Sequence, residues 1–267
     1  MPAYRLHLEY DGTAFRGWQV QPGKRTVQGE LHGALSQLFR QPVEVVGAGR
    51  TDAGVHALGQ VASFASDLEF EPRRLLHALA GLLPGDVRVW GVGHASTGFS
   101  ARHNALSRHY RYRFRRGSSV FARRTHHVLA HGVDLEAMRT VAALWVGEHD
   151  FSAFAATRSA ASHRRCRVLE AQLHVAEPQL WFEVTADRFL QNMVRRLAGT
   201  LIEVGRGRRT VAEVQHALRT GDPRGCGPCL PPEGLFLLEV RYPADRTFEA
   251  SAVWDAPPGA EPLESTR

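Results

Sequence analysis

The residues of this chain best suited to chemistry lie in a short polar insert, Arg50-Thr51-Asp52, between two apolar segments. Glycines flank the insert, and glycine lets the backbone turn sharply and bring side chains close to a ligand. We therefore predict a loop at a strand end that offers one carboxylate, Asp52. Arg50 precedes it by two residues, and a guanidinium within ~4–6 Å lowers an aspartate pKa by ~1–3 units. A carboxylate kept ionised in this way can act as a nucleophile, a base or a charge stabiliser.

Two other interpretations of the insert stay open when only its own residues are considered. Residues 49–52, considered alone, favour a surface turn closed by an ion pair. A glycosidase would need a second carboxylate facing Asp52. The insert contains none, and Glu148 and Asp150 could approach it only through the fold.

The other candidate groups, a cysteine pair and a histidine cluster, do not favour a redox or metal site. Cys226 and Cys229 have thioredoxin-like spacing, but prolines follow them where such a site needs a helix to begin. His126, His127 and His131 could face one another on a helix, yet no cysteine or carboxylate joins them at ligand spacing. We therefore predict no metal and no redox centre.

Composition indicates a basic protein of a reducing compartment. The formal net charge is +6 over 267 residues, and Lys24 is the only lysine, so arginine supplies nearly all the positive charge. Arginine binds phosphates bidentately and stacks on bases, which suits RNA, although a coding bias toward arginine explains the ratio equally well. Three cysteines are an odd number and argue against a disulfide framework. No apolar run approaches the ~20 residues of a membrane span, so we expect a cytoplasmic protein without a membrane partner.

Apolar alternation and helical spacing predict the elements that position the insert. In the first half we predict strands at residues 4–10, 43–46, 58 onward and 87–92, and helices at 27–39 and 71–83. This is the βαββαβ order of a ferredoxin-like plan. The second half repeats it with one extra helix, from strands at 108–116, 167–175, 180–186 and 235–240 and helices at 134–146, 189–204 and 211–218.

The predicted fold class is α+β, with two ferredoxin-like (RRM-like) halves whose antiparallel sheets are joined side by side around a central cleft. Residues 1–105 form the half that carries the Asp52 loop, and residues 106–243 form the other. Residues 244–267 are rich in Pro, Ala and Glu, a composition for which we expect a disordered tail.

One predicted strand carries a basic strip. His109, Arg111, Arg113 and Arg115 alternate with Tyr110, Tyr112 and Phe114 along residues 108–116. The strip can face RNA or simply be an outer strand face in solvent, and both interpretations stay open.

Several segments resemble the tRNA pseudouridine synthases of the TruA family. The strongest is GRTDAGVHA at 49–57, followed by LGQV at 58–61. The others are LEYDGT at 8–13, GWQ at 17–19, TVQ at 26–28, YRY at 110–112, HDF at 149–151, FL at 189–190, MVR at 193–195 and PPEGLF at 231–236. They occur in the family's order over roughly residues 4–242.

The resemblance implies roles for four residues. Asp52 matches the family's nucleophilic aspartate, and Tyr110 matches its substrate-contacting tyrosine. Arg50 and Arg195 match arginines near that aspartate. Cys226 and Cys229 stand where the family usually has small or hydroxylated residues, which supports an incidental CxxC.

The resemblance also implies the reaction and the partners. It implies isomerisation of uridine to pseudouridine in the tRNA anticodon stem-loop, at positions 38–40, with the base flipped out of its stack and with no cofactor or metal. Family members are dimers, so we expect a homodimer. The rival hypothesis is a non-catalytic RNA-binding module on duplicated RRM-like domains. That module would not explain Asp52, because an exposed carboxylate hinders phosphate binding.

Overall fold

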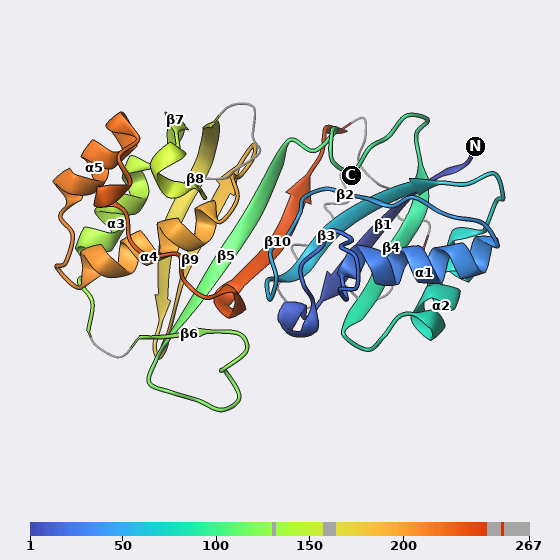
Figure 1. Ribbon diagram of the computed structural model, residues 1–267, viewed down its shortest axis with the longest axis horizontal. Coiled ribbons are helices and arrows are strands. Elements are labelled where there is room, and N and C mark those ends of the chain that lie inside the picture. The colour runs from blue at the N-terminus through green and yellow to red at the C-terminus, as the bar shows by residue number, and fades with distance from the viewer. Residues whose placement is uncertain (130–131, 157–163, 245–251, 254–267) are drawn as a thin grey trace. The chain divides into compact units, whose positions relative to one another are not determined.

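The computed structural model describes residues 1–129, 132–156, 164–244 and 252–253. These residues form two compact units. Unit 1 contains Met1–Leu106 and the described residues from Leu237 onward, and unit 2 contains Ser107–Phe236. Within the described residues the chain is a mixed α/β protein with five α-helices and mostly antiparallel strands (Figure 1). None of the helices in this part of the chain is long and apolar enough to cross a membrane.

Unit 1 is built on an antiparallel sheet in which β1 lies between β3 and β4. Its elements are β1 (Ala3–Tyr10), α1 (Val27–Phe39), β2 (Val46–Gly47), β3 (His56–Ala65), α2 (Pro72–Leu82), β4 (Val87–Ala95), β10 (Leu235–Arg241) from Leu237 onward, and β11 (Ala252–Val253). The strand order is β11-β4-β1-β3-β10, with β2 paired to β3. The order β1-α1-β2-β3-α2-β4 along the chain is the predicted one.

Strand β2 begins later than predicted because residues 43–45 hydrogen-bond to side chains of α1. Val43 N donates to Ser36 Oγ at 3.2 Å. Val45 N donates to His32 Nε2 at 3.2 Å, and Val45 O accepts from a glutamine of the same helix. These bonds satisfy the backbone of an irregular segment, so only Val46–Gly47 joins the ladder of β3.

Strand β1 is buried on both faces, whereas the alternation predicted one buried face. Tyr4, Leu6 and Leu8 are fully buried, as expected, and the Tyr4 ring contacts Phe39 of α1. On the opposite face Arg5 and His7 are also buried. The Arg5 guanidinium lies 4.1 Å from the ring centroid of Tyr242, and burial lowers the pKa of Arg5 to about 10. Tyr242, which is far from β1 in the sequence, therefore covers the face of β1 that the alternation of polar and apolar residues assigns to solvent.

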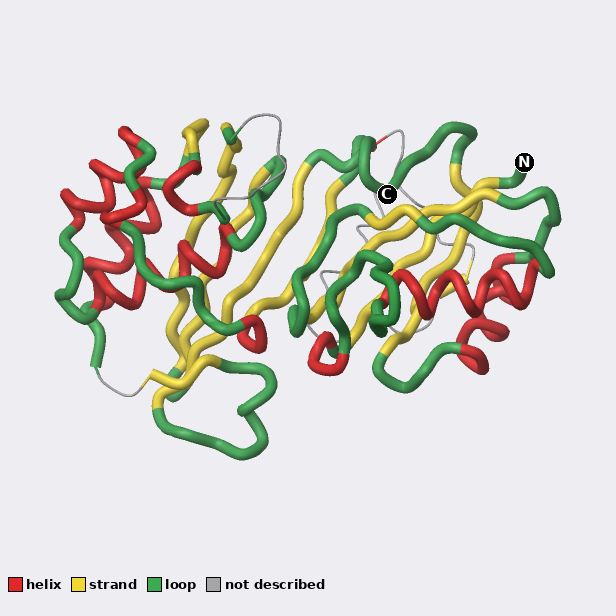
Figure 2. The backbone as a smooth tube through the Cα atoms, in the orientation of Figure 1, coloured by secondary structure: helices red, strands yellow, loops and turns green. Residues whose placement is uncertain are grey.

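Unit 2 is built on antiparallel strands covered by three helices (Figure 2). Its elements are β5 (Ser107–Arg116), β6 (His127–Leu129), α3 (Leu135–Leu144), β7 (Gly147–Asp150), β8 (Arg165–Ala176), β9 (Gln179–Ala186), α4 (Met193–Gly205) and α5 (Val211–Thr220). The strand order is β5-β9-β8-β7, and β6 pairs in parallel with β5. Tyr110, Tyr112 and Phe114 lie on the buried face of β5, which confirms the predicted alternation.

Two helix predictions in unit 2 need correction. Helix α4 begins at Met193 rather than at residue 189, because Asn192 has a left-handed backbone with φ of 63° and cannot continue a helix upstream. His127 lies on strand β6, so the helix considered for the histidine cluster is wrong. His131 lies outside the described residues.

Part of the predicted tail belongs to the sheet of unit 1. Ala252 pairs with Val92 and Val253 with Gly91, which places β11 antiparallel to β4. Ala252 is buried in this arrangement. The rest of the predicted tail beyond Ala244 lies outside the described residues.

Candidate active site

The Asp52 loop connects β2 to β3 in unit 1. Ala48 N donates to Val61 O at 2.8 Å where the strands separate, and Val55 N donates to Asp52 O at 3.1 Å where β3 is about to begin. Gly54 has a positive φ of 80°, the conformation that glycine adopts readily. The predicted sharp turn beside Asp52 is therefore present.

A buried polar network supports this loop from beneath. The Tyr10 and Thr51 hydroxyl oxygens are 2.8 Å apart. Gln60 Nε2 donates to Tyr10 Oη at 3.3 Å and to Gly49 O at 3.0 Å. All three side chains are buried, and Gln60 is 0% exposed. Burial raises the pKa of Tyr10 to about 12, although its bonds to Thr51 and Gln60 partly oppose this. Tyr10 is therefore a neutral hydrogen-bonding partner at physiological pH.

The loop backbone is also held by the segment at residues 15–18. Trp18 N donates to Thr51 O at 3.0 Å, and Gly54 N donates to Phe15 O at 3.3 Å. Gly17 has φ of +92°, and a Cβ atom there would lie 2.7 Å from Thr51 O. A glycine is needed at Gly17 both for its backbone conformation and for this close approach.

Next to the loop, His56 fixes the turn that follows β1. His56 is buried, and its Nδ1 accepts a hydrogen bond from Gly12 N at 3.1 Å. Asp11 Oδ1 lies 3.2 Å from the same nitrogen. A Cβ atom on Gly12 would lie 1.9 Å from Val55 O, so this turn packs directly against the start of β3.

Asp52 is half-buried, between the buried Thr51 and the exposed Ala53. Its backbone is fixed on both sides by the bonds described above. Arg50, two residues earlier in the same loop, is exposed. The arrangement gives a carboxylate on a rigid support, which suits a group that must be positioned for attack.

Tyr110 lies on β5 of unit 2 and is 7% exposed. Its ring meets the ring of Phe189 edge-on, with centroids 5.1 Å apart and planes at 84°. On the neighbouring strand its backbone partner is Val184. Phe189, which precedes α4, therefore packs against the Tyr110 ring.

Arg195 lies in the first turn of α4 and anchors a neighbouring segment. Its Nε donates to Leu230 O at 2.6 Å, and its Nη1 donates to Asn192 Oδ1 at 3.0 Å. In turn Leu230 N donates to Arg195 O at 3.3 Å. The guanidinium has five N–H donors and can bind several partners at once.

The four predicted site residues are divided between the units. Asp52 and Arg50 share one loop of unit 1, whereas Tyr110 and Arg195 belong to unit 2. Their assembly around one substrate stays a prediction.

The basic strip on β5 is partly neutralised. Arg111 Nε donates to Glu183 Oε1 at 2.7 Å, while His109 Nε2 and His174 Nε2 lie 3.4 Å and 3.6 Å from Glu183 Oε2. Burial opposes ionisation of Glu183, but the bonds to His109 and Arg111 outweigh it and lower its pKa to about 2. Arg113 lies over the ring of Phe236, 4.0 Å from its centroid. The strip therefore offers less free charge than its sequence indicates.

The CxxC pair has the wrong environment for redox chemistry. Cys226 is buried, and burial raises the pKa of its thiol to about 12, whereas a redox cysteine has a lowered pKa. Cys166, Cys226 and Cys229 are all free thiols. Within the described residues, no group of three or more His, Cys, Asp or Glu side chains could hold a metal ion.

Comparison with known proteins decides the family. A family profile described as tRNA pseudouridine synthase matches residues 7–96 and 141–243. A tRNA pseudouridine synthase A from Exiguobacterium sibiricum is 37% identical over 92% of this chain and 99% of its own length. Proteins of the same name from Geobacter sp. (strain M21) and Myxococcus xanthus are 42% and 43% identical, over 90% and 91% of this chain and 98% and 92% of their own lengths. This chain belongs to the tRNA pseudouridine synthase family.

Family membership confirms the resemblance inferred from the sequence. The matched residues include the Asp52 loop and Arg195, whereas Tyr110 falls between the two matched ranges. Among solved structures, a Cbf5-Nop10-Gar1 complex matches 87% of this chain and 57% of its own, at 12% identity and a TM-score of 0.32, which is too low to carry an argument.

Sequence reasoning found the family segments around the loop but missed what their residues do. Tyr10, Trp18 and Gln60 lie in segments quoted for the resemblance, yet their support of the loop is visible only in three dimensions. One signal was available: Gln60 is a polar residue inside the apolar run of β3, and a buried amide needs partners.

Proposed function

We propose that this protein isomerises uridine to pseudouridine in the tRNA anticodon stem-loop, at positions 38–40, with Asp52 as the nucleophile. The observation that carries the proposal is the Asp52 loop itself. It belongs to the part of the chain that matches the family, and buried hydrogen bonds from Tyr10, Trp18 and Gln60 hold it. A surface turn would not need such support.

The chemistry asks for a positioned carboxylate and a base that can rotate. The bond between uracil N1 and ribose C1′ breaks, a bond between C5 and C1′ forms, the hydrogen on C5 leaves as a proton, and N1 takes up a proton, so the composition is unchanged. No net oxidation occurs. Asp52 would attack either the ribose or the uracil ring, and both routes stay open. If Asp52 attacks the ribose, formation of the carbon–carbon bond displaces its carboxylate from C1′. If it attacks the uracil ring, the carboxylate leaves after that bond has formed, when the C5 proton is lost and the ring double bond is restored.

The target base must leave its stack before Asp52 can act, at a cost of a few kcal/mol. Stacking of a base on an aromatic ring is worth ~1–3 kcal/mol and would offset part of this cost. We assign that contact to Tyr110, whose ring packs edge-on against Phe189. Its hydroxyl would help to position or deprotonate the base.

The two arginines would serve Asp52 in different ways. We assign Arg195 to the carboxylate, because a buried charge without a partner would take up a proton instead. Its bonds to Leu230 and Asn192 would hold the guanidinium ready for this. The exposed Arg50 would contact the substrate from the same loop as Asp52.

The same proposal includes the architecture and the assembly. We propose ferredoxin-like halves at residues 1–105 and 106–243, with sheets side by side around a cleft that contains the Asp52 loop. The βαββαβ order of unit 1 supports the first half. We also propose a cytoplasmic homodimer whose partner is tRNA, without a cofactor.

Release of tritium from tRNA labelled at uracil C5 tests the function. The purified protein is expected to release tritium in proportion to the pseudouridine formed, and mass spectrometry should locate the product at positions 38–40. A protein that binds the same tRNA but releases no tritium would be an RNA-binding module, and the proposal would be rejected.

A further inference from the structure

The longest stretch of the sequence without aspartate or glutamate includes the loop between β5 and β6. Residues 87–133 contain no aspartate or glutamate and nine arginines. Three of these arginines, Arg88, Arg111 and Arg116, form ion pairs with Glu9, Glu183 and Glu177 from other parts of the chain. The part that leaves the sheet is residues 117–126, here called the β5–β6 loop, and it carries Arg123 and Arg124, both exposed. A concentration of arginine without carboxylates favours a polyanionic partner.

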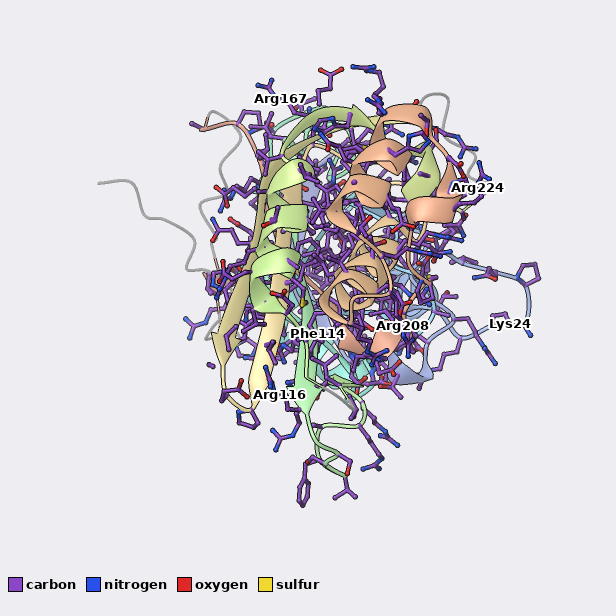
Figure 3. All side chains as sticks on the ribbon, turned by 90° about the vertical axis from the view of Figure 1, so that its left-hand side faces the viewer. Lys24, Phe114, Arg116, Arg167, Arg208 and Arg224 are labelled. Atoms are coloured by element: carbon purple, nitrogen blue, oxygen red, sulfur yellow. The ribbon has the colours of Figure 1, made fainter. Side chains whose placement is uncertain are left out.

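Hydrogen bonds within the β5–β6 loop hold it in a defined conformation. Ala122 N donates to Ser119 O at 3.2 Å, and Thr125 N and His126 N both donate to Ala122 O at 3.0 Å. Arg123 Nη1 donates to Val120 O, so this arginine is anchored by a carbonyl group. The chain then returns to β5 through β6, which pairs with the end of the strand it left. Figure 3 labels Arg116 at this end of the strands, and the loop projects beyond it.

Two large apolar side chains stand at the outer part of this loop. Phe121 is 93% exposed and Val120 is 66% exposed. An exposed phenylalanine beside two exposed arginines combines a stacking surface with phosphate-binding groups. Proteins that bind single-stranded nucleic acid use this combination, with aromatic rings on the bases and cations along the backbone.

We propose that the β5–β6 loop is a second RNA contact, in which Phe121 stacks on an unpaired base and Arg123 and Arg124 bind phosphates. This inference rests on the proposed function, because it takes tRNA as the partner. Tyr110 and Arg116 are six residues apart on β5, which is about 20 Å at ~3.3 Å per residue. The loop therefore contacts nucleotides other than the one that Tyr110 would hold.

A second copy of this chain is the alternative occupant, and charge argues against it. In a two-fold interface the same patch meets itself, so the arginine pairs of two such loops would face each other. Like charges placed opposite one another disfavour association. RNA supplies the opposite charge and a base for Phe121.

Filter binding with unmodified tRNA over a range of salt concentrations tests this contact. R123Q/R124Q is expected to reduce the slope of log K against log salt by about 1.4 to 1.8, since each lost phosphate contact contributes ~0.7–0.9. F121A is expected to weaken binding about fivefold or more, because stacking on one base is worth at least ~1 kcal/mol, with the salt slope unchanged. F121A should not affect folding, since the side chain is almost fully exposed.

A matched control is the exposed arginine pair Arg73 and Arg74 on α2. R73Q/R74Q removes the same charge and is expected to leave the salt slope within 0.3 of the wild type (about a third of one phosphate contact). An equal loss of slope in this control would overturn the inference, because it would reflect net charge alone. Unchanged binding in F121A and R123Q/R124Q would also overturn it. So would a loss of dimer mass in light scattering without a change in tRNA affinity.

The tritium assay separates this inference from the proposed function. Wild-type turnover together with unaltered binding in the loop variants rejects the second contact and leaves the function intact. Absence of turnover in the wild type rejects the proposed function, and the binding data still decide whether the loop contacts RNA.

Discussion

Replacing Thr51 by valine tests whether the buried network positions Asp52. The two side chains have similar volume, but valine removes the hydroxyl that lies 2.8 Å from Tyr10 Oη. Tyr10 then keeps only the bond from Gln60. A buried polar group that loses its partner costs ~1–3 kcal/mol, so we expect the free energy of unfolding to fall by that amount.

The same change should lower turnover more than binding. If the loop shifts to relieve the lost bond, Asp52 moves with it, and a displacement of about 1 Å can cost ~10²-fold in rate. We therefore expect Thr51→Val to reduce kcat by ~10- to 100-fold, while tRNA affinity changes by less than about threefold, because neither side chain is assigned a contact with RNA. Single-turnover tritium release gives the rate, and filter binding gives the affinity.

A double-mutant cycle isolates the interaction. Tyr10→Phe and Thr51→Val should each destabilise the fold, and the double variant should cost little more than the worse single variant, with coupling of ~0.5–3 kcal/mol. Thr51→Ser keeps the hydroxyl and is the matched control, expected near wild-type turnover. Additive single effects, or a serine variant as impaired as the valine variant, would refute the positioning role.

Three other substitutions probe separate parts of the structure. Gly17→Ala places a Cβ atom 2.7 Å from Thr51 O, at a residue whose φ is positive. Urea titration should therefore find the protein at least ~1 kcal/mol less stable. Unchanged stability would contradict the close approach. Tyr110→Phe keeps the ring and should leave tRNA affinity unchanged while slowing turnover; full activity would restrict Tyr110 to ring contacts. Glu183 has a pKa lowered to about 2, so its ionisation stabilises the fold above the unfolded pKa of ~4.3 and this stability is lost as the pH falls toward 2. Thermal melting of Glu183→Gln should therefore depend less on pH between 4 and 2 (roughly the interval between those two pKa values) than that of the wild type, and an identical dependence would contradict the assignment.

The elements of the fold followed from local patterns. Thr26 caps α1 by accepting a hydrogen bond from Gly29 N, and the helix runs over Val27–Phe39 as its apolar spacing predicts. Alternation along β5 gave the buried face of Tyr112 and Phe114 correctly. These features depend on neighbours in sequence, which is why one sequence was enough to predict them.

The errors occurred where distant segments meet. Arg5 is buried because Tyr242 packs over it, and the backbone of Val45 bonds to His32 of α1 instead of extending a strand. Neither partner is close in sequence. The same holds for the candidate site. Asp52 was found from its motif, but the bond between Tyr10 and Thr51, 41 positions apart, that supports its loop was not.

Asp52→Asn tests the central claim most directly, because it keeps the size of the side chain and removes its ability to act as a nucleophile. Tritium release from C5-labelled tRNA should fall by ~10⁴-fold or more, as expected when a nucleophile is removed. Affinity for the same tRNA should stay within about threefold of the wild type, because binding does not depend on the attacking oxygen. Substantial turnover by this variant would contradict the account, since it would mean that another group attacks the uridine.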